Sequence, residues 1–381
     1  MSKIAVGIIG CGYWGPNLIR NFSGCPHTEV AAVYDASPER LEKLRRTHGH
    51  LRLVSSFEEF LATPGLQAVA IATPVSTHFP LARQCLEAGL HVLVEKPLAA
   101  TVREAQALTA LAERVGKVLM VDHTYLFGNP VRKIKELVEH GELGELYYVD
   151  SIRINLGLFQ RDVNVIWDLA PHDLSIVDHV LGAEARSISA WGCAHANPDL
   201  EDVAYVNVDY GERLMASFHV NWLSPVKIRQ MIFAGSRKSL IFNELNTTEP
   251  IKVYDRGIDI AQSAEEVQKL LINYRSGDVW SPNIESSEAL QSVAGHFAEC
   301  IRDGVPCLSD GRMGLRVVQL LESATRSIKA QGGRVVLSNG NSTNGNGTAR
   351  ALRPEQLPAD RPDRPAGAGR GDSLLRESVR V

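Results

Sequence analysis

The first third of the chain alternates short apolar runs with longer amphipathic stretches. The apolar runs are about six residues long and rich in β-branched side chains, as is typical of strands buried on both faces. We predict such strands at residues 3–9, 29–35, 68–73, 91–96 and 118–123. Because helical stretches separate these strands, the pattern predicts a parallel, doubly wound α/β sheet.

Two of the intervening helices carry terminal signals in the sequence. Ser37 is a suitable cap, Pro38 fits the first helical position, and Gly49 is a stop signal. Thr101 and Glu104 have the spacing of a capping box. These signals support a first domain over residues 1–124.

The pattern changes after residue 124. A helix over 129–144 is followed by runs that alternate apolar and polar residues with a period of two, which predicts antiparallel strands with one covered face. Late helices are predicted over 286–304 and 311–333. The expected fold is an α/β Rossmann domain followed by an α+β domain (125–337) with an open, mainly antiparallel sheet.

The segment 338–381 is rich in Asn, Gly, Pro and Arg and has almost nothing to bury, so we expect a disordered tail. The formal net charge of -4 and the lack of a long basic run argue against a nucleic-acid partner. No apolar stretch is long enough to cross a bilayer, and the first residues lack the pattern of a signal peptide, so we expect no membrane partner and a cytoplasmic location.

Six scattered cysteines without a CxxC pair favour reduced, buried thiols over disulfides or a zinc knuckle. They are Cys11, Cys25, Cys85, Cys193, Cys300 and Cys307.

A glycine motif follows the first strand directly. Gly10, Gly12 and Gly15 have GxGxxG spacing at the start of a helix, where the loop and the helix N-terminus can hold a pyrophosphate. Asp35 ends the second strand, and a carboxylate there accepts hydrogen bonds from ribose hydroxyls and repels a 2′-phosphate. The motif favours NAD over NADP, although Arg40 is near enough to keep NADP open.

Four separated segments, GCGYWGPNLIRNF, ATPVSTH, VLVEKPLA and DLAPHDLSIVD, occur in the order and spacing of one family. Over residues 3–337 the chain resembles the Gfo/Idh/MocA family of NAD(P)-dependent oxidoreductases. The resemblance implies an active site between the two domains, with Lys96 of the Glu-Lys-Pro motif beside the nicotinamide and the reacting hydroxyl. It also implies that Asp168 and His172 match the family pattern Asp-x-Gly-x-His, with alanine in place of glycine.

A more detailed match concerns GYWGPN, VIWDLAPHD and NWLSPVKIRQMIFAGSRKSLIFNE, which resemble the branch acting on nucleotide-linked sugars, especially by oxidation at C3. Dehydrogenases of a free inositol or of an aminosugar in a secondary-metabolite pathway share many of these residues and remain an alternative. A nucleotide diphosphate needs cations, which a free polyol does not. The candidates are Arg153, Arg161, Lys227 and Arg229.

The chemistry divides between two side chains. Removing a hydride from a carbinol carbon leaves a proton on oxygen, so a base and a cation are needed there. We predict that His172 is the general base or acid, that Lys96 polarises the oxygen, and that Asp168 orients the histidine by a hydrogen bond. A sensor that binds NAD without chemistry is a further alternative, but its expected mark is loss of the lysine or the histidine.

The segment 166–179 contains these residues and three further ionisable ones. We expect a helix that begins near Leu169 with Asp168 as its N-cap, which places Asp168 and His172 on one side. His172 and His179 are two turns, or about 10 Å, apart and cannot share one ion, so no metal site is predicted. Asp173 and Asp178 are assigned to a polar helix face and His179 to a solvated or interface position.

The predicted site residues fall into two groups, some of which have plain structural alternatives. His78 can be a helix N-terminal residue without a chemical role, Glu95 can pack at its strand end, and His123 and Tyr125 can belong to the core or a hinge. The cofactor group is Gly10, Gly12, Tyr13, Trp14, Gly15, Asp35, Thr73, Pro74, His78, Glu95, Lys96 and Pro97. The substrate group is Lys96, His123, Tyr125, Asn155, Arg161, Trp167, Asp168 and His172.

The open sheet also predicts self-association. Large apolar residues alternate through 214–223 and 229–235, and an exposed apolar sheet face is a poor monomer surface. We therefore expect a homodimer or homotetramer formed through the C-terminal sheet.

Overall fold

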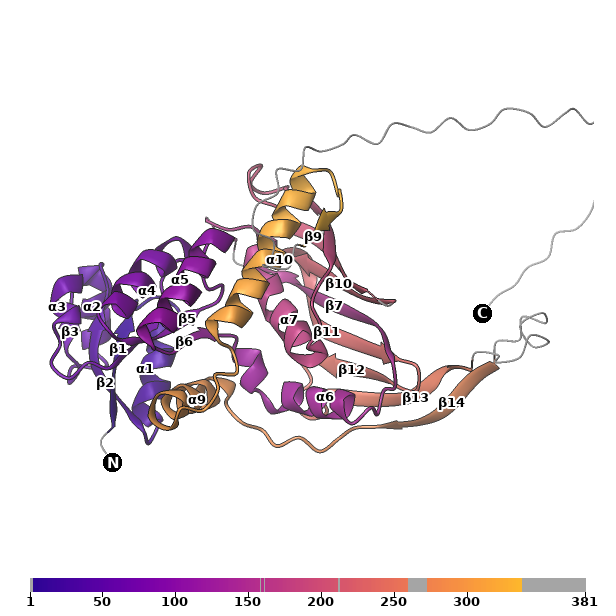
Figure 1. The fold of residues 1–381 in the computed structure, drawn as a ribbon, viewed down its shortest axis with the longest axis horizontal. Coiled ribbons are helices and arrows are strands. Elements are labelled where there is room, and N and C mark those ends of the chain that lie inside the picture. Colours follow the sequence, from indigo (N-terminus) through magenta and orange to yellow (C-terminus); the bar gives the residue numbers. More distant parts are fainter. Residues whose placement is uncertain (1–2, 158, 161, 212, 260–272, 338–381) are drawn as a thin grey trace, which may run out of the picture. The chain divides into compact units, whose positions relative to one another are not determined.

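The computed structural model describes residues 3–157, 159–160, 162–211, 213–259 and 273–337 (Figure 1). These residues belong to one compact unit and contain two sheets. The predicted tail, 338–381, and the candidate Arg161 lie outside the described residues. No helix in the described ranges combines the length and the apolar content needed to cross a membrane.

The first sheet is parallel and has six strands in the order β3-β2-β1-β4-β5-β6. The strand order reverses between β1 and β4, which is where open α/β sheets bind ligands. All five strands expected from the sequence are present, whereas β3 has two residues and was too short to be predicted. The bounds are β1 Ile4–Ile9, β2 Thr28–Tyr34, β3 Leu53–Val54, β4 Ala68–Ile71, β5 His91–Glu95 and β6 Leu119–Asp122.

Two helices around this sheet start at the cap residues predicted from the sequence. The Ser37 hydroxyl accepts a hydrogen bond from the Arg40 amide, and the Thr101 hydroxyl accepts one from the Glu104 amide. Helix α2 ends at Arg45, before Gly49, because the Leu44 carbonyl accepts from the amides of residues 47 and 48 in a closing turn. The bounds are α1 Gly15–Gly24, α2 Pro38–Arg45, α3 Phe57–Leu61, η1 Val75–Thr77, α4 His78–Glu87, α5 Val102–Val115 and η2 Thr124–Phe127.

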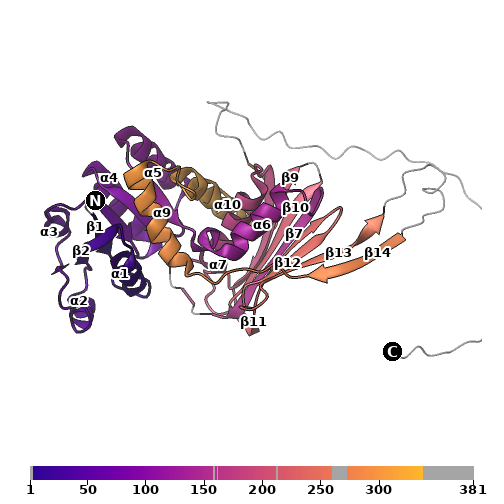
Figure 2. The ribbon, with the colours of Figure 1, turned by 90° about the horizontal axis from the view of Figure 1, so that it is seen from below.

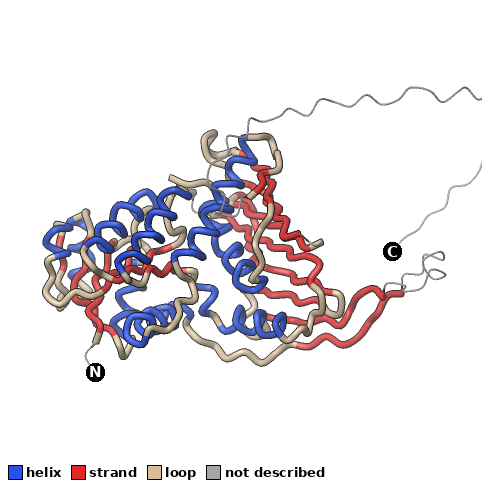
Figure 3. The backbone as a smooth tube through the Cα atoms, viewed as in Figure 1, coloured by secondary structure: helices blue, strands red, loops and turns tan. Residues whose placement is uncertain are grey.

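The second sheet has nine strands in the order β14-β13-β12-β11-β7-β10-β9-β8-β15. Its strands are drawn in red in Figure 3. Every described pair is antiparallel except β7 with β10, which confirms an open, mainly antiparallel sheet. The sequence did not predict β14 or β15. The bounds are β7 Leu146–Leu156, β8 Ser187–Cys193, β9 Val203–Gly211, β10 Leu214–Asn221, β11 Leu223–Gly235, β12 Ser239–Asn243, β13 Ile251–Asp259, β14 Asn273–Trp280 and β15 Val335–Val336.

The remaining helices are α6 Asn129–Glu139, α7 Val165–Leu181, α9 Ala289–Asp303 and α10 Gly311–Lys329. Helix α7 packs on β7, β9 and β10, and α10 packs on β8, so both cover one face of the second sheet (Figure 1). The two late helices also reach the first sheet, because α10 packs on α5 and α9 packs on α1 (Figure 2). The boundaries 1–124 and 125–337 stay a prediction, since the C-terminal helices join the two sheets.

Candidate functional site

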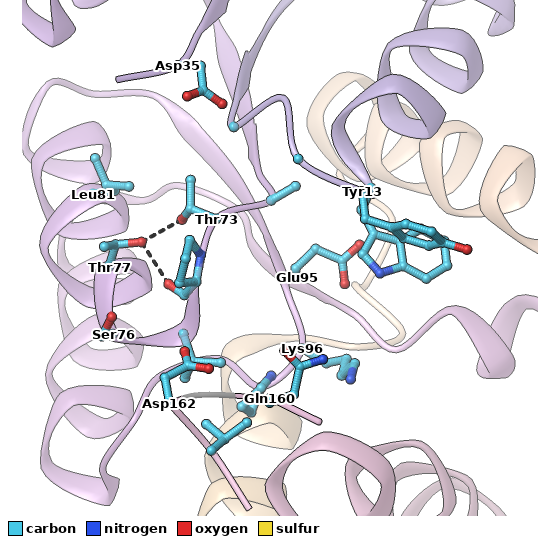
Figure 4. Close-up of a pocket in the computed structure, with 18 of the residues that line it drawn as sticks. Tyr13, Asp35, Thr73, Ser76, Thr77, Leu81, Glu95, Lys96, Gln160 and Asp162 are labelled. Atoms are coloured by element: carbon cyan, nitrogen blue, oxygen red, sulfur yellow. Dashed lines mark hydrogen bonds between the residues drawn. The ribbon is translucent and has the colours of Figure 1, made fainter. Parts of the chain in front are cut away.

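A cleft of about 780 Å³ lies between the carboxyl ends of the first sheet's strands and the start of α7 (Figure 4). Because the carboxyl ends of parallel strands meet at one sheet edge, loops far apart in the sequence converge on this space. The predicted site residues that line it are Gly10, Gly12, Tyr13, Trp14, Asp35, Thr73, Pro74, Glu95, Lys96, Pro97, Trp167 and Asp168. The lining also includes Arg40, Gln160 and Asp162, and the last two were not predicted.

The three motif glycines are required for different reasons. Gly10 has a φ of +100°, and a side chain on it would stand 2.5 Å from the carbonyl oxygen of Ala72. A side chain on Gly15 would stand 2.2 Å from the carbonyl oxygen of Gly10, so this glycine lets α1 pack against the loop. A Cβ on Gly12 would meet no protein atom within 4 Å. The protein itself therefore leaves the space above Gly12 for a ligand, as a dinucleotide requires.

The start of α1 is also suited to an anion. Its N-cap, Trp14, makes no side-chain capping hydrogen bond. The first amide groups of a helix lack partners within the helix and carry a partial positive charge, so they favour a phosphate.

Asp35 is a buried carboxylate fixed at the edge of the cleft. Its Oδ2 accepts a hydrogen bond from the Cys11 amide (2.7 Å), and its Oδ1 accepts one from the Ser37 amide (2.8 Å). A carboxylate oxygen can accept further hydrogen bonds, so both oxygens remain available to ribose hydroxyls. Arg40 is more distant, with its guanidinium 3.7 Å from Oδ2 and its side chain mostly exposed.

His78 lies beneath the cleft and is absent from its lining. Its Nδ1 is 2.8 Å from the carbonyl oxygen of Pro97, and its Nε2 is 2.9 Å from that of Thr73. The ring thus connects the loops after β4 and β5. The Thr77 hydroxyl donates to the Pro74 carbonyl (2.7 Å) and lies 2.7 Å from the Thr73 hydroxyl (Figure 4). His78 thus contacts two backbone carbonyls and does not line the cleft, whereas we expected a direct cofactor contact.

Lys96 links the first sheet to α7. It follows β5 directly and precedes a cis peptide bond to Pro97. Its Nζ donates a hydrogen bond of 2.8 Å to the Asp168 carbonyl and lies 3.5 Å from Oδ1 of the same residue. The Asp168 carboxylate also accepts a hydrogen bond from the indole of buried Trp222 (3.2 Å).

Helix α7 begins at Val165, four residues before the predicted start. Asn164 is the N-cap, because its side-chain oxygen accepts a hydrogen bond from the Trp167 amide (3.1 Å). Asp168 therefore lies within the first helical turns and is not a cap. Pro171 lies inside the helix, where it cannot donate to the carbonyl of Trp167. The start expected near Leu169 is therefore too late, because the helix accommodates Pro171 beyond its first turn.

The expected hydrogen bond between Asp168 and His172 is wrong. The Nδ1 atom of His172 is buried without a hydrogen-bond partner, whereas Asp168 pairs with Lys96 and Trp222. The imidazole instead meets the edge of the Tyr125 ring, with 5.1 Å between ring centroids. Burial holds the pKa of His172 well below its ordinary value of 6.5, and the charges of Lys96 and of nearby arginines add to this effect. His172 is therefore neutral near pH 7.

Further polar groups lie at the end of β6. Asp122 is the register partner of Glu95, and burial raises the pKa of both carboxyl groups, that of Asp122 to about 6. Burial lowers the pKa of His123 to about 3, and neither of its ring nitrogens has a hydrogen-bond partner. The Oδ1 atom of Asn155 is also buried without one. Buried polar atoms are usually hydrogen-bonded, so these atoms are exceptions, and neither His123 nor Asn155 lines the cleft.

A buried network of charges packs behind His172. The Arg153 guanidinium donates to Asp173 (Nη2 to Oδ1, 2.7 Å) and lies 3.0 Å from Glu244. Arg229 is the register partner of Arg153 and donates to Glu244, as does the Tyr125 hydroxyl (2.7 Å). Two cations and two carboxylates thus balance one another inside the second domain.

This network corrects several predictions. Asp173 is fully buried and does not lie on a polar helix face, because α7 turns it towards Arg153 on β7. Arg153 and Arg229 are neutralised internally and are not free to hold a diphosphate, whereas Lys227 is exposed. Glu244 was missed, although its position just after a strand, opposite Arg229, follows from the pairing of β11 with β12.

The other two ionisable residues of α7 differ in their surroundings. Asp178 forms a two-pronged ion pair with Arg316 of α10. His179 is partly buried, and burial lowers its pKa to about 4. Trp167 lines the cleft and donates its indole hydrogen bond to the Thr325 hydroxyl (3.0 Å), which also joins α7 to α10.

The two aspartate pairs of α7 predict different stability effects. Asp173→Ala leaves buried Arg153 short of its main partner and should lower the free energy of unfolding by about 3–5 kcal/mol. Asp178→Ala removes the ion pair with Arg316, whose side chain is 45% exposed, and should lower the free energy of unfolding by less than about 1 kcal/mol. Urea unfolding of both variants measures the difference. Equal losses would show that leaving buried Arg153 without Asp173 does not destabilise the fold.

Two family models match this chain. Residues 4–123 match the model of an oxidoreductase family with an NAD-binding Rossmann fold, and residues 131–241 match the GFO/IDH/MocA C-terminal domain. The UDP-N-acetylglucosamine 3-dehydrogenase of Acidithiobacillus ferrooxidans is 27% identical over 84% of this chain and 95% of that protein. Its solved structure has a TM-score of 0.71, with 25% identity over 87% of this chain and 99% of that one.

Two further proteins differ in their named substrates or ligands. The scyllo-inositol 2-dehydrogenase (NADP(+)) IolW of Bacillus subtilis is 25% identical over 86% of this chain and 95% of that protein. GenD2 from gentamicin A biosynthesis, solved in complex with NAD, has a TM-score of 0.74 at 22% identity, over 89% of this chain and 97% of that one. The cofactor of the Rossmann domain is NAD. The chain belongs to the Gfo/Idh/MocA family of oxidoreductases.

Proposed function

We propose that the protein is an NAD-dependent dehydrogenase that moves a hydride between nicotinamide and a secondary alcohol of a sugar, with the C3 hydroxyl of a nucleotide-linked sugar as the favoured substrate. The observation that carries this proposal is the position of Lys96. Its ammonium group lies in the cleft at the end of β5, held by Asp168, with neutral His172 one helical turn further along α7. A sensor without chemistry has no need of this arrangement.

Bound NAD supplies the hydride acceptor, and the side chains manage the charge and the proton of the alcohol. Lys96 has three donors, one of which is used by the Asp168 carbonyl, so another can polarise the carbinol oxygen. The neutral imidazole of His172 can accept the hydroxyl proton as the hydride leaves. In the reverse direction the same residues return the proton to the carbonyl oxygen.

The role of Asp168 differs from the one first predicted. Its carboxylate is held by Trp222 and faces Lys96, so it positions the ammonium group. Tyr125 packs against the His172 ring and orients it in place of Asp168. We infer that His123 and Asn155, whose buried polar atoms lack partners, bind substrate hydroxyls.

The two substrate classes have different support. The similarity to the UDP-N-acetylglucosamine 3-dehydrogenase favours a nucleotide-linked sugar. The internal neutralisation of Arg153 and Arg229 favours a free inositol or aminosugar, because it removes two of the cations proposed for a diphosphate. Both classes use the same reacting site.

A substrate panel separates these classes. Purified protein with NAD is offered nucleotide-linked N-acetylhexosamines, free inositols and free aminosugars, and NADH is followed by absorbance. We expect the highest kcat/KM with a nucleotide-linked sugar, and oxidation at C3 identified by mass spectrometry after borodeuteride reduction. A preference for inositol would favour the alternative. Absence of turnover with the whole panel, despite NAD binding, would contradict the proposed reaction class.

Substitution of Lys96 tests the mechanism. Lys96→Met keeps the length of the side chain and removes the ammonium group, so turnover should fall by about 100-fold or more while the Kd for NAD stays nearly unchanged. Lys133→Met, which removes a surface lysine paired with Glu136, is the matched control and should retain full activity. A normal rate in Lys96→Met would remove the proposed role of this residue.

We further propose that the enzyme forms a homodimer or homotetramer through the second sheet. Side chains alternate between the two faces of a strand, and on β9 Ala204 and Val206 are buried in the core. The opposite face of the sheet carries three large apolar side chains that are about half exposed: Tyr205, Trp191 and Met215. An exposed apolar face of this kind is typical of an interface.

All six cysteines are free, which supports the proposed cytoplasmic location.

Light scattering tests the association. Wild-type protein should elute as a dimer or larger species, and Trp191→Glu combined with Tyr205→Glu should yield monomers because it buries charge in the interface. Val305→Glu changes an exposed apolar residue outside the sheet and should leave the mass unaltered. A wild-type monomer at micromolar concentration would contradict this proposal.

A further inference from the structure

A cluster of thiols and an imidazole lies outside the catalytic cleft. One ligand atom from each of His296, Cys300 and Cys307 lies within 4.8 Å of the others. Cys300 is in the last turns of α9, and Cys307 is in the connection to α10. We propose that Cys300 and Cys307 are a peroxide-sensitive dithiol that closes to an intramolecular disulfide.

The two segments that bear Cys300 and Cys307 are both held in place by contacts with the first sheet and its helices. Helix α9 is fixed against α1 by Phe22 and Phe297, whose rings meet edge to face. The connection is fixed to β6, because the Ser309 carbonyl accepts from the Val121 amide (2.8 Å) and its hydroxyl donates to the Val121 carbonyl (2.7 Å). The two thiols therefore stay close without a large rearrangement.

The surroundings of Cys300 favour its reactivity. Its Sγ lies 3.4 Å from Nε2 of His296. The hydrogen bond that the Cys307 thiol donates lowers the pKa of Cys300 to about 5, whereas the same pairing and burial raise the pKa of Cys307. A thiolate is the nucleophile in thiol chemistry, so Cys300 is the attacking residue and Cys307 the resolving one.

A small oxidant can reach the pair. Cys300 and Cys307 both line a surface pocket of about 330 Å³, together with Gly304, Lys117 and Arg312. The pocket is large enough for hydrogen peroxide. The other cysteines of the chain, including buried Cys25 and Cys85 and exposed Cys193, belong to no such group within the described residues.

The reaction consumes one peroxide. The Cys300 sulfur attacks a peroxide oxygen, so that an S–O bond forms and the O–O bond breaks, and the departing hydroxide leaves as water with the thiol proton. The Cys307 sulfur then attacks the Cys300 sulfur. An S–S bond forms, the S–O bond breaks, and a second water leaves with the proton of Cys307. Two electrons pass from the thiols to the peroxide.

A soft metal ion is the rival occupant of the same three residues. Two observations disfavour it. The Nε2 atom of His296 accepts a hydrogen bond from the Leu308 amide (3.0 Å), so its lone pair is already used. The group has three members among the described residues, whereas structural zinc sites use four protein ligands.

Peroxide titration of the reduced, full-length protein tests the proposal. Peptide mapping without reductant should show a Cys300–Cys307 disulfide that dithiothreitol reverses. Cys307→Ser should instead accumulate a sulfenic acid on Cys300 that dimedone traps, and Cys300→Ser should give neither product. Cys193→Ser, which removes the exposed thiol, should leave the disulfide yield unchanged, and circular dichroism verifies that each variant is folded.

Two results would overturn the proposal. The first is free thiols at both positions after excess peroxide in folded protein. The second is stoichiometric zinc on the protein as purified that is lost in both serine variants of the pair, which would identify a metal site instead.

Discussion

The contact between Lys96 and Asp168 is the interaction on which the proposed site depends. The lysine belongs to the first sheet and the aspartate to the helix that covers the second, so the contact joins the cofactor region to the polar groups of α7. It requires α7 to begin at Val165 under the Asn164 cap, because that start determines where the Asp168 carbonyl and carboxylate lie. The cleft is therefore assembled by packing between domains.

Burial and the positive charges behind the cleft keep the His172 imidazole unprotonated, as its proposed role requires. Arg153 and Arg229 raise the positive potential around the imidazole, and burial removes the water that would solvate an imidazolium. Glu244 and Asp173 compensate the two arginines in turn, so the interior carries no net excess charge. Buried ion pairs contribute little net stability, because removing both charges from water costs about as much as their attraction returns.

The sequence predicted those parts of the site that depend on local pattern. The glycine loop, Asp35 and Lys96 each adjoin a strand end, and a parallel sheet brings strand ends to one edge. Prediction failed where distant segments decide the outcome. Asp173 is buried because β7 presents Arg153 to α7, and Glu244 joins the network through strand pairing. The local pattern of apolar and polar residues predicts neither the burial of Asp173 nor the position of Glu244. Likewise, the proximity of Cys300 to Cys307 depends on how α9 and β6 hold their connection.

A double-mutant cycle on Lys96 and Asp168 measures the central contact directly. The hydride-transfer rate is determined under single-turnover conditions for Lys96→Met, Asp168→Asn and the combined variant, with the sugar that wild-type protein oxidises best. If Asp168 acts by positioning the ammonium group, the combined variant should be no slower than Lys96→Met alone. Losses that multiply in the combined variant would show that the two residues act independently and would contradict the proposed coupling.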